Sequence, residues 1–557
     1  MAQIAQHDLL TLDAILAHWS AEQPDAAAIE GGGLTSTCAE IERMSRQISA
    51  MLAARGIGAG DRVAFLGKNA PSYGLLYCAC ARAGIVIAPI GWRLAPREIA
   101  YILGDTGAKL LVAAPDFMAL AAAAMAELTS PPELLEEAAM MAEAGACDAA
   151  DFTPCGADDP VLQLYTSGTT GHPKGVLLSN ANLTKLRVEG IAAGLTYYTD
   201  YRSGDCMMVA MPIAHIGGTG TFSLAMLAGI RCRFEAEFTP AGVLAAIEAG
   251  TTHMFLVPAA LQMVIQHPQA ATTDFSNLRY LIYGAAPMPL ELLKQAVETM
   301  PGTQFLQAYG MTETTGTVSI LPPEDHSLEG NQRMRSAGKA LPGVEIEVRG
   351  PDNVEVPRGA IGEVCIRSPS NTAGYWKLPE ATAKTIDPDG WLHTGDAGVM
   401  DAAGYVYIQD RIKDMIISGG ENVYPAEVES AIYGHPAIAE VAVIGVKDPL
   451  KGQRPVGYVV LKSGQVRDPD ELRSELVAMV RERVGVRGLL AGLSIVTRTE
   501  LLMVVIGALF VAEKRAAIDA VIGRLSALGL GDLMLDAHAG SGTPADLVDT
   551  LARRLVT

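Results

Sequence analysis

The chain has 557 residues, of which 49% are hydrophobic and 19% charged, and its 42 Lys and Arg residues against 62 Asp and Glu residues give a formal net charge of −20. This balance excludes an intrinsically disordered chain, and the length predicts several domains of roughly 150 residues each. The acidic surplus argues against nucleic acid or an anionic membrane surface as the main partner, so any phosphate ligand must be held by a local site.

Eight cysteines are scattered along the chain, and none forms a Cys-x-x-Cys pair. This distribution predicts buried thiols in a reducing compartment rather than a zinc ribbon or a thioredoxin-like site. The N-terminal residues show no basic segment followed by an apolar core, which argues against a signal peptide. The longest apolar run, residues 501–512, is shorter than the ~20 residues that a membrane-spanning helix needs. A cytoplasmic protein without a transmembrane segment is expected.

The first elements alternate helical patterns with short apolar strands. Residues 39–54 predict a helix with Gly56 as its stop signal, and Arg62–Leu66 and Ile85–Ile90 predict strands. Strands that alternate with helices of this length are typical of parallel α/β sheets. Residues 115–150 are rich in Ala, Met and Glu, and they predict helices on the surface.

A run rich in hydroxyls and glycines extends from Tyr165 to Val176 and reads Tyr-Thr-Ser-Gly-Thr-Thr-Gly-His-Pro-Lys-Gly-Val. Glycines let backbone N–H groups point into a concavity, and the hydroxyls and the ammonium group of Lys174 add further donors. The run therefore predicts a cradle for polyphosphate. It is not a Walker loop, because Gly175 rather than Ser or Thr follows the lysine. A plain turn between two strands is the competing interpretation, but such a turn needs neither the lysine nor so many hydroxyls.

The α/β pattern continues with predicted strands at residues 207–211, 254–257 and 280–283. The last strand leads into Tyr-Gly-Ala-Ala-Pro at residues 283–287, whose small side chains let a flat base approach the backbone. A tight turn from strand to helix explains the same residues equally well.

Residues 307–314 read Gln-Ala-Tyr-Gly-Met-Thr-Glu-Thr and bring an aromatic ring, a hydroxyl and a carboxylate close together. Tyr309 is suited to stack on adenine, Thr312 to bond a phosphate, and Glu313 to hold Mg²⁺ through a hard oxygen. A capped helix start is the alternative.

Past residue 340 the pattern changes, because alternating segments at 344–348 and 362–367 are separated by Gly and Pro, as in an antiparallel or barrel-like module. Residues 390–396 then read Gly-Trp-Leu-His-Thr-Gly-Asp. A carboxylate such as that of Asp396 is suited to accept hydrogen bonds from both hydroxyls of a ribose, although an Asx turn explains it too.

Residues 411–425 read Arg-Ile-Lys-Asp-Met-Ile-Ile-Ser-Gly-Gly-Glu-Asn-Val-Tyr-Pro. Arg411 supplies a forked cation, and the glycines after Ser418 let the loop approach a ligand or another backbone closely. A glycine turn beside a surface charge cluster is the competing interpretation. A smaller α/β domain is expected from about residue 415, with a helix at 425–433 and a strand at 441–446.

In this order, the five segments closely resemble the adenylate-forming superfamily of acyl-CoA synthetases, luciferases and peptide-synthetase adenylation domains. Residues 410–425 are most similar to the fatty-acyl-CoA and aryl-CoA ligase branch, and the resemblance covers about residues 10–486. It implies an α/β fold in which a large N-terminal domain of two α/β sheets plus a distorted β-barrel is followed by a small, mobile α+β C-terminal domain. The expected bounds are 1–409 for the large domain, 410–414 for the hinge, 415–486 for the small domain and 487–557 for an atypical tail.

The resemblance also implies the reaction and its site. A carboxylate attacks Mg·ATP to give acyl-AMP and pyrophosphate, and CoA then displaces AMP, so ATP, Mg²⁺, CoA and a small carboxylic acid are the expected ligands. The residues at the family's ATP and AMP positions are Thr166, Ser167, Gly168, Thr169, Thr170, Gly171, Lys174, Gly284, Ala285, Ala286, Ala308, Tyr309, Gly310, Met311, Thr312, Asp396 and Arg411. The catalytic positions are Lys174, Thr166, Glu313 and His215, with Thr166 and Glu313 beside the metal. The hinge and CoA-side positions are Lys413, Ser418, Gly419, Gly420 and Glu421.

His215 falls at the family's acyl-pocket position, although a lone histidine is usually a satisfied core residue. Gly217 and Gly218 remove side chains beside it, which is compatible with a pocket for a long or bulky acyl group.

The chain departs from the family pattern at its C-terminal end. The family's small domain ends in a Pro-x-Thr-x-x-Gly-Lys segment whose lysine reaches the adenylate phosphates, and no such segment follows residue 486, where Lys514 is the only lysine. A frameshift, a gene fusion or a divergent tail would account for residues 487–557, and each predicts slowed adenylation.

The leading hypothesis is an acid:CoA ligase for a medium- or long-chain fatty acid or an aryl or alicyclic acid. A luciferase-like oxygenase, an acyl-AMP ligase that serves a carrier protein, and a non-catalytic adenylate-binding remnant stay open, and so does a homodimer. A P-loop kinase is disfavoured by Gly175.

Overall fold

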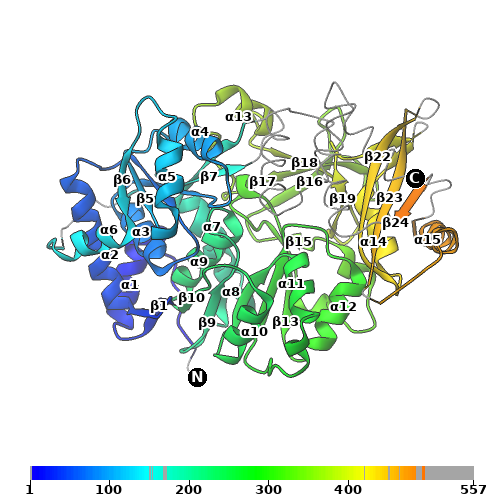
Figure 1. Ribbon diagram of the computed structural model, residues 1–557, viewed down its shortest axis with the longest axis horizontal. Helices are drawn as coiled ribbons and strands as arrows, with labels where there is room; N and C mark the ends of the chain where they lie inside the picture. The colour runs from blue at the N-terminus through cyan, green and yellow to red at the C-terminus, as the bar shows by residue number, and fades with distance from the viewer. Residues whose placement is uncertain are drawn as a thin grey trace. The chain divides into compact units, whose positions relative to one another are not determined.

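The computed structural model describes residues 3–149, 152, 155–166, 172–418, 421–448, 452–462, 464–484 and 492–495. The chain forms two compact units (Figure 1). The first comprises residues 1–288, 292–394 and 399–407, and the second comprises residues 289–291, 395–398 and the chain from 408 onward. Each unit combines helices with sheets, so the predicted α/β class, with a large N-terminal part and a smaller C-terminal part, is confirmed.

One sheet of the first unit has six strands, and all neighbours are parallel except the last pair. In spatial order the strands are β6 (Glu133–Glu136), β5 (Leu110–Ala113), β3 (Arg62–Leu66), β4 (Val86–Ile90), β7 (Pro160–Thr166) and β8 (Lys174–Ser179). Side chains of β3 alternate between two cores, as the period of a strand requires. Val63 and Phe65 join one hydrophobic core, and Ala64 and Leu66 join the other, so both faces of the sheet are covered.

The second sheet has nine strands with a parallel centre and antiparallel edges. In spatial order they are β15 (Lys339–Ala340), β14 (Ser319–Leu321), β13 (Gln304–Tyr309), β12 (Tyr280–Gly284), β11 (His253–Leu256), β9 (Cys206–Val209), β10 (Arg231–Phe234), β1 (Ala27–Gly31) and β2 (Leu34–Thr37). A third sheet has the order β16 (Glu345–Arg349), β17 (Ile361–Arg367), β18 (Leu392–Met400) and β19 (Val406–Arg411).

Helices fill the spaces around these sheets. The α-helices up to residue 385 are α1 (Leu12–Glu22), α2 (Cys38–Ala54), α3 (Pro71–Arg82), α4 (Pro96–Thr106), α5 (Met118–Met125), α6 (Glu137–Gly145), α7 (Asn180–Ala192), α8 (Thr196–Thr199), α9 (Ile216–Ala228), α10 (Pro240–Glu248), α11 (Pro258–Ile265), α12 (Leu290–Thr299) and α13 (Pro379–Thr385). The short 3₁₀ turns are η1 (Pro115–Phe117), η2 (Pro268–Ala271), η3 (Thr312–Thr314), η4 (Pro323–Asp325) and η5 (Gln332–Arg335).

Helix α3 is buried from Ser72 to Arg82 and joins the first two sheets. The hydroxyl of Tyr73 lies 2.7 Å from Thr219 Oγ1, and that of Tyr77 lies 3.0 Å from Ser223 Oγ on α9. Each tyrosine thus buries its ring while its polar tip keeps a partner, as a buried tyrosine requires. The two sheets therefore share one hydrophobic core in which α3 and α9 are in contact.

Among its described residues, the second unit contains a five-stranded sheet and two helices. Its elements are β20 (Ile416–Ser418), β21 (Glu421–Val423), α14 (Pro425–Tyr433), β22 (Ile438–Asp448), β23 (Gly452–Leu461), α15 (Pro469–Val484) and β24 (Gly492–Ile495). The helices pack on the sheet through a core that includes Ile416, Val428, Ile432, Val459 and Leu472. Strand β24 pairs with β23 in parallel, so this sheet includes residues beyond position 486.

Most predicted elements are present, with one correction. The strand predicted at 62–66 and the helix predicted at 425–433 have those bounds, and the helix predicted at 39–54 starts one residue earlier because Thr37 forms a capping box with Glu40. The helices predicted within residues 115–150 are present as α5 and α6, but a strand between them was not predicted. Residues 133–136 form β6, which pairs with β5 because buried Leu135 extends the hydrophobic core at the edge of the sheet.

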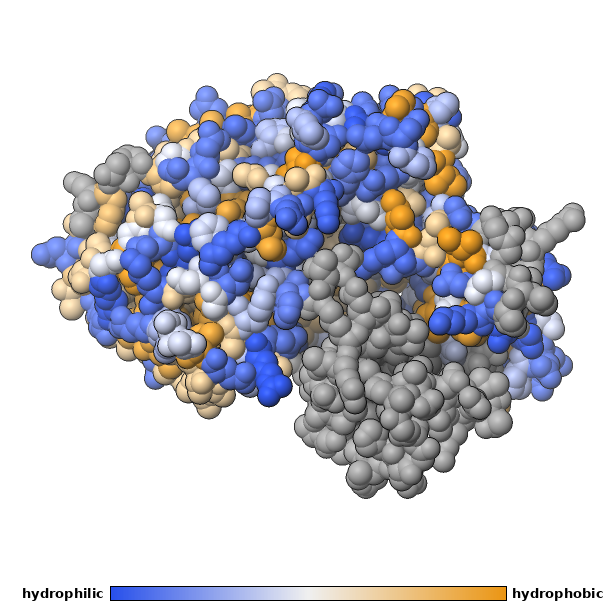
Figure 2. All heavy atoms as spheres, turned by 90° about the horizontal axis from the view of Figure 1, so that it is seen from above, coloured by the Kyte–Doolittle hydropathy of each residue, from blue (hydrophilic) through white to orange (hydrophobic). Residues whose placement is uncertain are grey.

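The surface agrees with the composition. Over the described residues the face shown in Figure 2 is mostly hydrophilic, and its hydrophobic residues lie in small groups. None of the described helices is both long and apolar enough to cross a membrane. All eight cysteines lie in the described part and are free thiols, and seven of them are buried.

Arg82 gives a test of the core around α3. Its side chain is 1% exposed and its guanidinium lies 2.7 Å from carboxylate oxygens of both Asp13 and Glu42. We expect Arg82→Met to lower the free energy of unfolding by about 3 kcal/mol, because it leaves two carboxylates without their buried cation. Urea denaturation followed by circular dichroism measures this change.

Arg358 supplies the matched control, since it pairs with Glu355 at 2.7 Å while 47% of its side chain is exposed. Arg358→Met should change stability by less than about 1 kcal/mol. Equal effects of the two substitutions would contradict the importance of the buried cation.

Candidate functional site

The β7–β8 hairpin carries the hydroxyl- and glycine-rich run. Its antiparallel register ends with Thr166 opposite Lys174, so these two residues stand at the base of the loop. Ser167, Gly168, Thr169, Thr170 and Gly171 lie outside the described residues. Gly175 has a packing reason of its own, because a Cβ there would lie 2.5 Å from Gln163 Nε2.

Glu313 lies next to the end of β7 although it is 147 residues away in sequence. It belongs to η3, its side chain is buried, and the hydroxyl of Thr166 donates to its Oε1 at 3.4 Å. The turn that carries it depends on Gly310, where a Cβ would lie only 1.6 Å from the carbonyl oxygen of Gly316. The structure therefore brings together Thr166 and Glu313, the two residues predicted to hold Mg²⁺.

Tyr375 is a component of this site that the sequence prediction missed. Its hydroxyl donates to Glu313 Oε1 at 2.8 Å, and Lys174 Nζ lies 4.7 Å from the centre of its ring. Burial and the neighbouring Glu313 carboxylate raise the pKa of Tyr375 above its ordinary value, so the hydroxyl stays protonated and donates. One tyrosine thus contacts both the predicted metal ligand and the predicted phosphate-binding cation.

The backbone around Tyr375 pairs with β8. Leu177 N donates to Gly374 O at 3.2 Å, and Trp376 N donates to Gly175 O at 2.7 Å. Thr372 N also donates to the backbone oxygen of Glu313 at 2.8 Å. Residues 372–376, which we call the crossing segment, therefore hold the hairpin and the Glu313 turn in one register. The sequence signal is weak, an adjacent Tyr and Trp after Gly374 in a stretch between strands.

The residues predicted for adenine lie where two parallel strands end. Gly284 is paired with Ala308, and a Cβ on Gly284 would lie 2.0 Å from Ala308 O. Ala285 has a φ of +64°, a left-handed conformation that is rare without glycine and turns the chain sharply away from the sheet. Tyr309 is the last residue of β13, and Ala286, Met311 and Thr312 follow the two strands. Ligands of open α/β sheets bind outside these carboxyl ends.

His215 lies at the N-cap of α9 and is exposed. The two glycines beside it have packing explanations. A Cβ on Gly218 would lie 2.3 Å from Pro212 O, and a Cβ on Gly217 would lie 3.0 Å from the ring of Phe255. The close backbone contact therefore requires glycine at position 218. At position 217 the missing side chain leaves room beside the ring of Phe255.

Asp396 and Arg411 belong to the second unit. The two side chains form an ion pair with Arg411 Nε 2.8 Å from Asp396 Oδ1, and Asp396 is buried. Lys413 is exposed in the turn between β19 and β20. Ser418 pairs with Glu421 across a hairpin whose tip, Gly419 and Gly420, lies outside the described residues.

The donors at the end of β7 fit a magnesium ion. Mg²⁺ prefers hard oxygen ligands from one or two protein groups and completes its shell with water and substrate phosphates. The Thr166 hydroxyl and the Glu313 carboxylate are such donors on neighbouring elements, with Lys174 close by to balance phosphate charge. These residues would hold the ion beside a polyphosphate.

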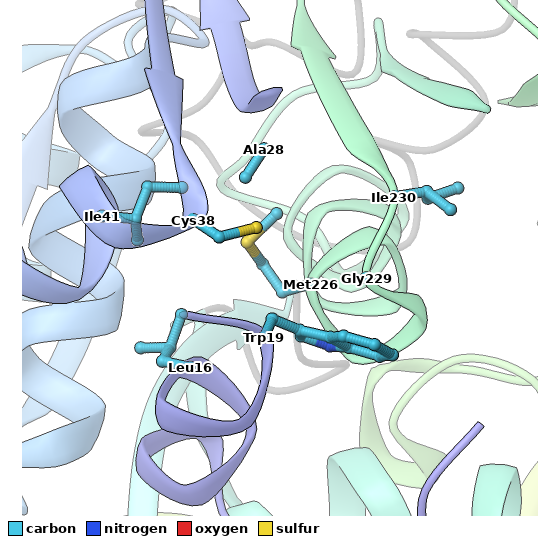
Figure 3. Close-up of a pocket in the computed structure, with 8 residues that line it drawn as sticks. All are labelled: Leu16, Trp19, Ala28, Cys38, Ile41, Met226, Gly229 and Ile230. Atoms are coloured by element: carbon cyan, nitrogen blue, oxygen red, sulfur yellow. The ribbon is translucent and has the colours of Figure 1, made fainter. Parts of the chain in front are cut away.

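An apolar pocket lies elsewhere, among α1, α2 and α9 (Figure 3). Cys38, Met226 and Trp19 line it, and buried Trp19 Nε1 has no hydrogen-bond partner among the described residues. Gly229 at its edge has a φ of +69° and would place a Cβ 2.5 Å from Trp19. This lining has no charged group for a carboxylate or a phosphate, so we assign the pocket to imperfect core packing.

Comparison with known proteins identifies the family. Residues 16–376 match the AMP-binding enzyme family, and residues 427–497 match the AMP-binding enzyme C-terminal domain. The chain belongs to the AMP-binding enzyme family. It is therefore an adenylate-forming enzyme of the acid–thiol ligase class, as the motifs predicted, and this class uses ATP, Mg²⁺ and CoA.

Three relatives illustrate the likeness. The chain is 38% identical over 485 residues to the fatty acid–[acyl-carrier-protein] ligase ScoC of Streptomyces coeruleorubidus, which covers 86% of this chain and 92% of that protein. It is 39% identical over 456 residues to a feruloyl-CoA synthase of an Amycolatopsis species, covering 81% and 88%. The structure of O-succinylbenzoate coenzyme A synthetase (MenE) from Bacillus subtilis, in complex with ATP and magnesium ion, matches with a TM-score of 0.75 and 29% identity, covering 87% and 96%.

The hydroxyl of Tyr375 can be tested directly. Tyr375→Phe keeps the ring beside Lys174 but removes the shorter of the two hydroxyl contacts to Glu313 Oε1, and losing a hydrogen bond to a charged group costs about 1.5–3 kcal/mol. We expect ATP–pyrophosphate exchange to slow by roughly 10–100-fold, with a higher Mg²⁺ concentration needed for half-maximal rate.

Tyr405→Phe is the matched control, because the Tyr405 hydroxyl also donates to a buried carboxylate, Asp325 Oδ2, at 2.6 Å. It should leave both the exchange rate and the Mg²⁺ dependence unchanged. An unaltered Mg²⁺ dependence in Tyr375→Phe would show that Tyr375 does not position Glu313.

Proposed function

We propose that this enzyme activates a carboxylic acid as acyl-AMP and transfers the acyl group to CoA, releasing AMP and pyrophosphate. The acid is a medium- or long-chain fatty acid or an aryl or alicyclic acid. The observation that carries the proposal is the grouping of Thr166, Lys174 and Glu313 at the base of the β7–β8 loop. A buried carboxylate, a hydroxyl and an ammonium group together suit a metal-bound polyphosphate.

In the first step the substrate carboxylate forms a bond to the α-phosphorus of ATP, and the bond to the β-phosphate bridging oxygen breaks. Lys174 and the loop hydroxyls bind the departing pyrophosphate, which gains charge as it leaves. When bound by Thr166 and Glu313, Mg²⁺ supplies further charge neutralisation for the phosphates. Thr312 binds the α-phosphate, and residues 284–286 with Tyr309 line the adenine site.

The second unit contributes to both steps. The Asp396 carboxylate accepts hydrogen bonds from the ribose hydroxyls, and Arg411, paired with it at 2.8 Å, holds it in place. In the second step the CoA thiolate attacks the acyl carbon and AMP leaves. By the family resemblance, Lys413 is the hinge residue and residues 418–421 act on the CoA side. We also propose that the large domain comprises residues 1–409, the hinge residues 410–414 and the small domain residues 415–486.

Two alternatives concern the thiol that accepts the acyl group and whether the chain is catalytic at all. A carrier-protein thiol is a second candidate acceptor, because the relative ScoC is a fatty acid–[acyl-carrier-protein] ligase. A non-catalytic remnant is not favoured, since the described residues retain the whole set of Thr166, Lys174 and Glu313. The free thiols support a reducing compartment such as the cytoplasm.

A panel of acids tests the proposal. The full-length enzyme is incubated with Mg·ATP and either CoA or a phosphopantetheinylated carrier protein, and products are identified by mass spectrometry. We expect an acyl-CoA thioester with at least one fatty or aryl acid, whereas a thioester on the carrier alone would favour the second acceptor.

Glu313→Gln should lower this turnover by about 10²–10³-fold, as expected for loss of one charge-stabilising group. The exposed Glu324→Gln is the matched control and should behave as the unaltered enzyme. Full turnover by Glu313→Gln would show that this site takes no part in the reaction.

The C-terminal tail gives a separate prediction. The adenylation lysine expected after residue 486 is absent from the sequence, and the tail from 496 lies outside the described residues. Loss of that cation should slow acyl-AMP formation by roughly 10²-fold or more, while thioester formation from synthetic acyl-AMP is retained. Comparing ATP–pyrophosphate exchange with thioester formation from acyl-AMP measures both steps, and exchange that is the faster of the two would contradict the prediction.

A further inference from the structure

A second cluster of ligand-type side chains lies on the third sheet of the first unit. Glu363, Cys365 and His393 each offer one ligand atom, and these atoms all lie within 4.8 Å of one another. His393 Nδ1 is 2.9 Å from Glu363 Oε2 and 3.5 Å from Cys365 Sγ. None of the three belongs to the ATP site described above.

Strand geometry explains why the three side chains meet. Glu363 and Cys365 are two residues apart on β17, so they point to the same face of the sheet. His393 is the second residue of β18, the next strand in the sheet. These positions are fixed by backbone pairing and do not depend on a flexible loop.

One nitrogen of the imidazole, Nδ1, lies close to both other ligand atoms. In the plane of the imidazole, Nδ1 has one position, which is either an N–H donor or a lone pair. As a donor it serves Glu363, and as an acceptor it serves the Cys365 thiol, so the tautomer of the ring decides which of the two contacts is a hydrogen bond. A cation at the centre of the three atoms would use all of them at once.

The other ring nitrogen faces a carboxylate. His393 Nε2 lies 3.9 Å from Asp387 Oδ2, and Asp387 is itself held by the backbone N–H groups of Trp391 at 2.9 Å and Asp389 at 3.0 Å. Metal-binding histidines usually direct their second nitrogen to such a carboxylate, which fixes the ring and strengthens the ligand. This arrangement is independent of the three ligand atoms.

The neighbouring cation does not occupy the site. Arg349 pairs with Glu347 at 2.8 Å and with Asp387 at 3.3 Å, and its guanidinium carbon lies 4.2 Å from the centre of the Trp391 ring. The side chains of Glu363 and His393 are 26% and 25% exposed, while Cys365 is buried. An ion can therefore enter from solvent and reach the buried sulfur.

We propose that Glu363, Cys365 and His393 bind a Zn²⁺ ion, with water as the fourth ligand. A thiolate, an imidazole and a carboxylate form a mixed set that suits tetrahedral Zn²⁺ and does not suit Mg²⁺ or Ca²⁺, which prefer oxygen ligands. The ion joins β17 to β18 and stabilises the first unit, because it binds the folded site and not the unfolded chain.

Metal titration of the full-length protein tests this site. Protein stripped with a chelator is titrated with CoCl₂ in excess MgCl₂, and with ZnCl₂ in a parallel thermal-unfolding series. We expect one Co²⁺ per chain with the visible bands of a tetrahedral site and a thiolate-to-cobalt charge-transfer band, displaced by Zn²⁺, and a higher unfolding midpoint with Zn²⁺. Absence of the charge-transfer band, or a spectrum typical of octahedral Co²⁺, would overturn the proposal.

Variants locate the ion. Cys365→Ser should abolish the charge-transfer band, and Asp387→Asn should weaken Zn²⁺ binding by about 10–100-fold, the usual effect of losing a carboxylate behind a ligand. Cys147→Ser is the matched control, because Cys147 is the one half-buried thiol, and it should leave the band intact. Retention of the band in Cys365→Ser, or its loss in Cys147→Ser, would place the metal elsewhere. ATP–pyrophosphate exchange checks that each variant is folded.

Discussion

The crossing segment, residues 372–376, is the constraint on which the proposed ATP site depends. Its backbone pairs with β8, and Tyr375 donates to Glu313 while its ring lies beside Lys174. These contacts fix the positions of three parts of the chain relative to one another: the hairpin, the η3 turn and this segment. Electrostatic stabilisation of a leaving group works only where the charges are already in place, because reorganisation during the reaction would remove most of the gain. The tyrosine supplies that preorganisation without a charge of its own.

The same requirement for fixed geometry explains several glycines near the site. Gly284 and Gly310 each stand where a Cβ would collide with a backbone oxygen, at 2.0 Å and 1.6 Å. Their role is to let strands and turns pass one another closely, which brings Ala308, Tyr309 and Glu313 to the ends of the parallel strands. In the sequence these glycines looked like contacts to a nucleotide. In the structure their first effect is on the backbone, and room for a ligand follows from it.

Much of the fold was predictable because local signals agreed. Arg62–Leu66 alternates between two cores, and residues 425–433 start with a proline suited to a first helical turn, so both have the predicted bounds. Strand β6 was missed because four residues with glutamates at both ends carry almost no periodicity. Thr166, Lys174 and Glu313 were predicted from motifs, whereas Tyr375 was not. Its partners are 62 and 201 residues away, and no local pattern encodes a contact of that separation. The Cys365–His393 contact, across 28 residues of two strands, escaped for the same reason.

The net charge of −20 makes the local arrangement decisive. A chain with this surplus repels ATP at long range, although at physiological ionic strength that field is screened beyond about 8 Å. Affinity for a polyphosphate must therefore come from groups in direct contact with it. Among the described residues around Glu313, Lys174 provides the ammonium group. Its described contact is with the ring of Tyr375 and not with an acid. A carboxylate partner would neutralise it, whereas the ring of Tyr375 orients the cation and leaves its charge for the phosphates. Because its hydroxyl contacts the predicted metal ligand and its ring contacts the lysine, Tyr375 positions both charges without cancelling either.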